Sequence, residues 1–115
     1  MSVYDTAADQ LKCVRALSMI LADGTLTMPS MWSIHTYPGF EPALTPTLEG
    51  LFHAHPSLTV AELRVLVEPY AEKFGLVVEE KPHGAGGMVG LHATGRWSGV
   101  DLKVWGPACP EGGAQ

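Results

Sequence analysis

The chain has 115 residues, enough for one domain with one hydrophobic core and too few for two independently folded domains. Hydrophobic residues make up 46% of the sequence, which excludes an intrinsically disordered chain. Twelve acidic residues against seven basic ones give a net charge of −5, which argues against a protein that binds nucleic acid through its phosphates.

The N-terminal region predicts a helix over residues 3–23. Gly24 follows the pattern and suits the left-handed end of a helix. The apolar stripe, at spacings of three and four, comprises Tyr4, Ala7, Ala8, Leu11, Val14, Leu17 and Leu21, with Cys13, Ala16 and Ile20 beside it. Because this stripe is wider than a small sheet needs, it also predicts a homodimer through this helix or through a sheet edge.

Two strands are predicted next, over residues 31–37 and 48–55, because apolar and polar side chains alternate there. Pro38, Pro42 and Pro46 predict an irregular loop between them. A second helix is predicted over residues 59–74. Thr59 and Glu62 have the spacing of a capping box, and Gly75 ends the pattern. Pro69 lies inside this helix and predicts a kink or a break.

The remainder of the chain predicts three strands, over residues 76–81, 88–97 and 100–105. The two-residue loop Ser98-Gly99 fixes the register of the last hairpin, which sets Arg96 opposite Asp101 and His92 opposite Trp105. Residues 106–115 are rich in glycine and proline and are expected to form a disordered tail. The sequence therefore predicts a single α+β domain over residues 1–105. Its order is α-β-β-α-β-β-β, with an antiparallel sheet and two helices mainly on one face.

The second face of this sheet is the candidate binding surface. Because side chains alternate between the two faces along a strand, we expect this face to carry His35, Tyr37, His53, His55, His92 and Trp105. Such a face is less polar than a solvated sheet face, so either helix 3–23 covers it or a partner binds there. If a partner binds there, replacing Trp105 by alanine should weaken that binding and leave the melting temperature nearly unchanged.

A metal site is the alternative use of these histidines. His53 and His55 are two residues apart on one strand and point to the same side, and His35 has the parity to join them. Glu49 is the one acidic residue beside them at strand spacing, which favours ordinary surface histidines. The sequence shows no nucleophile motif, and Gly84–Gly87 lacks the ending of a phosphate loop. No catalytic residue and no cofactor is predicted.

Four short segments resemble small uncharacterised α+β proteins of actinobacteria and their phages. The matching segments are Trp32-Ser33-Ile34, Leu48-Glu49-Gly50, Phe74-Gly75 and Gly99-Val100-Asp101-Leu102-Lys103-Val104. The resemblance implies an accessory protein and assigns no catalytic residues.

Together these features favour a small acidic protein that is not an enzyme. We expect it to act by stoichiometric contact with a macromolecule, and we expect that macromolecule to be another protein. The alternative is a small metal-dependent enzyme that uses His35, His53 and His55. Cys13 and Cys109 form no metal-binding motif and are expected to be free thiols. No apolar run approaches the roughly 20 residues of a membrane helix. We therefore expect a cytoplasmic protein with no membrane partner.

Overall fold

The computed structural model describes residues 6–36, 45–54, 57–84 and 86–110. In chain order its elements are α1 (Thr6–Leu21), β1 (Met31–His35), β2 (Thr47–Leu51), α2 (Val60–Phe74), β3 (Val77–Pro82), β4 (Val89–Trp97) and β5 (Val100–Ala108). The predicted α+β class with two helices is confirmed. In the described part of the chain, neither helix is long and apolar enough to cross a membrane.

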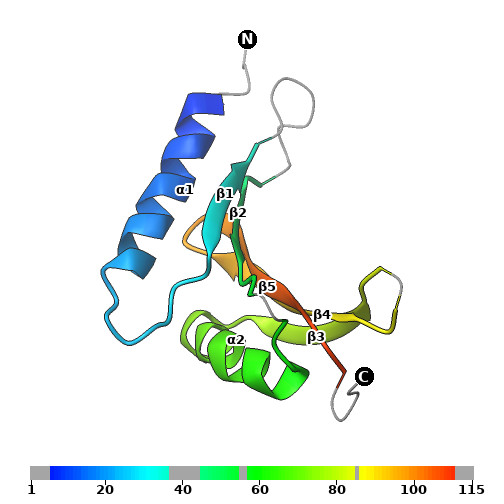
Figure 1. Cartoon of the computed structure of the whole chain (residues 1–115). Coiled ribbons are helices and arrows are strands. Elements are labelled where there is room, and N and C mark those ends of the chain that lie inside the picture. The colour runs from blue at the N-terminus through cyan, green and yellow to red at the C-terminus, as the bar shows by residue number, and fades with distance from the viewer. Residues whose placement is uncertain (1–5, 37–44, 55–56, 85, 111–115) are drawn as a thin grey trace.

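The five strands form one sheet in the order β1-β2-β5-β4-β3 (Figure 1). Three of the four strand pairs are antiparallel, but β2 and β5 are parallel, so the predicted antiparallel sheet is wrong. After β2 the chain passes through α2 and the β3–β4 hairpin before β5 inserts beside β2 in the same direction. The centre of the sheet is therefore β5, and its edges are β1 and β3.

The β4–β5 hairpin has the predicted register. Arg96 lies opposite Asp101 and His92 lies opposite Trp105. Both loop residues have positive φ, 54° at Ser98 and 81° at Gly99, as in the two-residue turns whose twist matches that of the strands. The turn therefore fixes which side chains of β4 and β5 are neighbours.

Strand β5 is longer than predicted. The expected disordered tail is wrong for Gly106–Ala108, which continue the strand, and residues 111–115 lie outside the described residues. A Cβ atom on Gly106 would lie 2.5 Å from the Phe52 carbonyl oxygen. Gly106 thus permits a close approach of two backbones, a role that the composition of this region did not reveal. Strand β2 is shorter than predicted and ends at Leu51.

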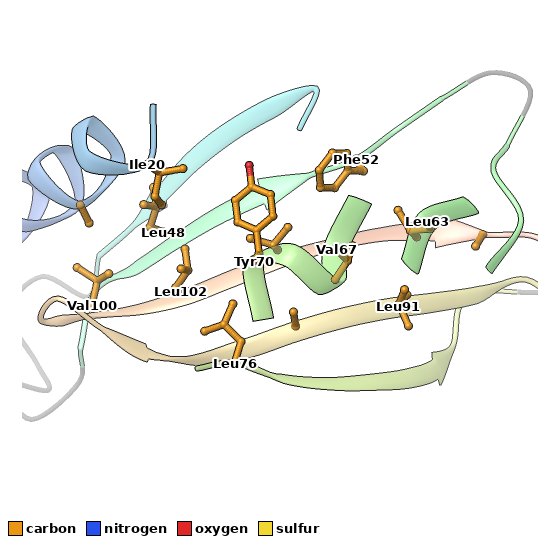
Figure 2. Close-up of a cluster of buried hydrophobic side chains, with 14 of the residues drawn as sticks. Ile20, Leu48, Phe52, Leu63, Val67, Tyr70, Leu76, Leu91, Val100 and Leu102 are labelled. Carbon is orange, nitrogen blue, oxygen red and sulfur yellow. The ribbon is translucent and has the colours of Figure 1, made fainter. Parts of the chain in front are cut away.

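Both helices pack on the same face of the sheet and share one hydrophobic core (Figure 2). The core combines Ile20 of α1 with Leu63 and Val67 of α2 and with inward side chains of the strands, such as Leu48 and Leu102. In Figure 1, α1 lies along β1, and α2 lies beneath β3 and β4. The suggestion that the first helix covers the second sheet face is therefore wrong.

Helix α2 begins and ends as predicted. The Thr59 side chain accepts a hydrogen bond from the Glu62 N–H, the Glu62 side chain accepts one from the Thr59 N–H, and Gly75 ends the helix with φ 72°. The helix continues through Pro69, so the predicted break does not occur.

Candidate binding site on the open sheet face

The sheet face opposite the helices carries the candidate site. Neither α1 nor α2 covers it, and we call it the open face. It comprises the side chains on the same side of the sheet as Asp101, Lys103 and Trp105 of β5. On β4 these are His92, Thr94 and Arg96, which the register sets directly opposite.

Trp105 is at the centre of the open face and is half-buried by its neighbours. Its indole Nε1 donates a 2.6 Å hydrogen bond to Glu49 Oε2 on β2. The His92 ring stacks on the indole with centroids 4.9 Å apart and planes 3° from parallel. The His83 ring lies 5.5 Å away, and Lys103 Nζ lies 5.2 Å from the indole centroid. These five residues form the Trp105 cluster.

The local backbone explains how the histidines reach Trp105. A Cβ atom on Gly90 would lie 2.7 Å from His92 Nε2, so the missing side chain leaves space for the His92 ring. His83 follows β3, and its N–H donates a 3.0 Å hydrogen bond to the Met88 carbonyl across the turn. The β3–β4 hairpin thus brings His83 back over β5.

The environment keeps His92 neutral near pH 7. Burial lowers the pKa of the His92 imidazole below its ordinary value of 6.5, and the positive charges of Lys103 and Lys81 and the neighbouring His83 lower it further. The Glu49 carboxylate opposes this shift. A neutral imidazole stacks on an indole without bringing an uncompensated charge to the partly buried site.

The other charges of the open face are mostly balanced. Lys81 Nζ lies 3.6 Å from Glu79, and Arg96 Nε lies 3.6 Å from Asp101. Beside the cluster is an open hollow of about 400 Å³ whose polar lining includes Thr47, Thr94, Arg96, Asp101 and Lys103. The open face therefore combines an aromatic centre with a polar, nearly neutral surround.

The predicted site residues are only partly brought together. The rings of His92 and Trp105 stack. His35 contacts the cluster through Glu49, since His35 Nε2 lies 3.1 Å from Glu49 Oε1. The exposed His53 lies beyond the end of β2, where its N–H and carbonyl both bond to the Ser30 hydroxyl. Tyr37 and His55 lie outside the described residues.

The alternative hypothesis of a metal site is wrong where it combines His35 with His53. His35 pairs with Thr47. His53 is six residues further along the chain, a separation of about 20 Å at strand spacing. One ion cannot bridge that distance. Within the described ranges, no three His, Cys, Asp or Glu side chains are grouped so as to hold a metal ion.

Three members of the Trp105 cluster, Lys103, His83 and Glu49, were not among the predicted site residues. Lys103 is two residues from Trp105 on β5, so strand alternation alone could have assigned it to the same face. His83 lies in a turn, where side chains do not alternate between the two faces of a sheet. No sequence signal would therefore have assigned it to the open face. Glu49 stood out by its spacing, but as a possible metal ligand and not as a partner of an indole.

No protein-family model matches the chain, and no curated protein or solved structure matches it either. The open face is therefore the feature of the molecule from which a function can be inferred.

Proposed function

We propose that this protein is a small acidic binding protein, without enzymatic activity, whose open face forms a stoichiometric complex with another protein. The observation that carries the proposal is the position of Trp105, half-buried at the centre of a sheet face that neither helix covers. Tryptophan is among the residues most enriched in the energetic centres of protein interfaces, which lie near the middle of the contact.

The composition of the open face supports a protein partner. Met31 on β1 and Val77 on β3 are 54% and 63% exposed on this face, at opposite edges of the sheet. Five strands about 4.8 Å apart and up to nine residues long give a face of roughly 20 by 30 Å. That area is of the same order as the roughly 800 Å² that one partner buries in a standard interface.

The charges favour a protein over a nucleic acid. Lys81 and Arg96 each lie beside an acidic side chain, so they supply little net positive charge for phosphates. The net charge of −5 on the whole chain also repels a phosphate backbone. A mixed, balanced surround of an aromatic centre is typical of protein interfaces.

We extend the proposal to an accessory role of the immunity, anti-defence or chaperone type in phage or mobile-element biology. The small size and the negative net charge of the chain support this role. Cys13 and Cys109 are both free thiols, which suits action in the reducing cytoplasm.

The test is capture of the partner from a lysate of the native host on immobilised protein. Three matched forms are compared: the wild type, Trp105→Ala on the open face, and Val65→Ala on α2. Val65 is 71% exposed and lies in the helix layer, so its truncation controls for loss of an exposed apolar side chain. We expect one protein in near one-to-one amount, retained by Val65→Ala and weakened roughly 30-fold by Trp105→Ala.

Two results would contradict the proposal. Capture that is equal for the wild type and Trp105→Ala, with both folded, would remove Trp105 from the interface. Capture that disappears after nuclease treatment would identify a nucleic acid as the partner instead of a protein.

A further inference from the structure

Lys103 differs from the other lysine and the arginine of the open face in having no acidic partner. Lys81 Nζ lies 3.6 Å from a Glu79 oxygen. Arg96 Nε lies 3.6 Å from an Asp101 oxygen. Lys103, in contrast, forms no ion pair within the part of the chain that the structure describes. Its ammonium group is therefore available to a negative charge from another molecule.

The acidic residue opposite Lys103 in the register is Glu49, and its carboxylate is already engaged. Glu49 Oε2 accepts the hydrogen bond from Trp105, and Oε1 lies 3.1 Å from His35 Nε2. Lys103 Nζ lies 5.2 Å from the centroid of the Trp105 indole instead. Because Lys103 is partly buried, an ion pair formed there is screened less than one on a fully exposed lysine.

Lys103 also lines the hollow of about 400 Å³ beside the Trp105 cluster. The hydroxyl groups of Thr47 and Thr94 line the same hollow and can donate hydrogen bonds. The charged residues of the lining are Lys103, Arg96 and Asp101, which give it a net charge of +1. That balance suits a carboxylate, which carries one negative charge, better than a phosphate group, which carries nearly two at pH 7.

We propose that this hollow binds an acidic side chain, Asp or Glu, of the protein partner, and that its carboxylate pairs with Lys103 Nζ. Hydrogen bonds between an ammonium and a carboxylate are stronger than those between neutral groups. The proposal rests on the proposed function, because the acidic side chain belongs to the protein that covers Trp105. Lys103 then determines specificity, since it selects partners that carry a carboxylate beside the residue that contacts the indole.

The first test is an NMR titration with two small probes, N-acetyl-glutamate N-methylamide and the corresponding glutamine compound. Both are added at the same pH and ionic strength. The glutamate probe should shift the backbone amide signals of Lys103 and Thr94 and the indole N–H signal of Trp105. We expect saturation with a dissociation constant on the order of 10 mM, as for a single ion pair. The neutral glutamine probe should leave these signals unchanged. Equal shifts with both probes, or none with either, overturn the proposal.

Matched variants show whether Lys103 is the residue that binds the probe. Lys103→Gln removes the charge and should abolish the shifts, whereas Lys103→Arg keeps the charge and should retain them. Lys81→Gln is the control, because it makes the same change at a lysine that already lies beside Glu79. Circular dichroism confirms folding, and Lys103→Met replaces Lys103→Gln if that variant does not fold. Shifts that persist in the folded, uncharged variant overturn the proposal.

Capture of the partner from the host lysate separates this proposal from the proposed function. Lys103→Gln should weaken capture roughly 10-fold and reduce its sensitivity to salt, and Lys81→Gln should do neither. Capture that Trp105→Ala weakens but Lys103→Gln does not would overturn the carboxylate site and leave the proposed function standing. Capture that Trp105→Ala does not change would overturn the proposed function, and this proposal with it.

Discussion

Replacing Trp105 by alanine should destabilise the protein less than replacing Leu102, although both residues lie on β5. Leu102 is 1% exposed and points into the core, where a leucine-to-alanine change costs about 2–5 kcal/mol. Trp105 faces the other side of the sheet, where its two closest contacts are with Glu49 and His92. The hydrogen bond to Glu49 contributes about 0.5–1.5 kcal/mol, and the stack with His92 contributes a similar amount. The expected loss is therefore about 1–3 kcal/mol.

This cost is larger than the sequence alone predicts, since an outward side chain with no neighbours would leave the melting temperature nearly unchanged. The stack with His92 and the hydrogen bond to Glu49 account for the difference. Trp105→Phe keeps a ring for the stack and removes only the N–H donor, so it should cost about 0.5–1.5 kcal/mol.

The assay is equilibrium unfolding in urea, followed by circular dichroism, for the wild type and the three variants. The midpoints give the order of stability, and unchanged slopes confirm that the same transition is compared. If Trp105→Ala is as destabilising as Leu102→Ala, or prevents folding, the two faces of the sheet have been assigned backwards. The open face would then be part of the core and could not bind a partner.

Three further predictions concern local features. Gly106→Ala should cost about 2–4 kcal/mol in urea unfolding, because its Cβ atom would lie 2.5 Å from a backbone oxygen; a neutral effect would contradict that packing. Thr59→Ala should cost about 1 kcal/mol in the same assay through loss of the capping box, and an unchanged midpoint would show that the cap adds nothing. Folding lowers the pKa of His92 below 6.5, so the unfolded chain takes up the proton first and the unfolding free energy should fall as pH drops below 6.5. An NMR titration of His92 that gives a value above 6.5 would contradict this.

The features that the sequence predicted well are those set by neighbouring residues. The capping box of Thr59 and Glu62 is specified within four positions, and the register of the last hairpin is specified by the two residues Ser98 and Gly99. Because that register also sets His92 beside Trp105, the centre of the candidate site could be predicted before any tertiary structure was known.

The features that the sequence did not predict depend on contacts between distant segments. The parallel pairing of β2 with β5 joins Thr47 to Asp101, and no local pattern distinguishes a parallel from an antiparallel neighbour. The proposed meeting of His35 with His53 failed for a related reason. Alternation gives the face on which a side chain lies, but only the pairing of β1 with β2 gives its position along the sheet.

The most direct test of the open face is site-specific photo-cross-linking in the native host. A photoreactive residue replaces Thr94, which lies on the open face opposite Lys103, or Val65, which is exposed on α2. The open-face interface predicts a cross-linked protein adduct from position 94 that disappears when Trp105 is also changed to alanine, and no such adduct from position 65. An adduct from position 65 alone, or one from position 94 that survives Trp105→Ala in a folded protein, would contradict it.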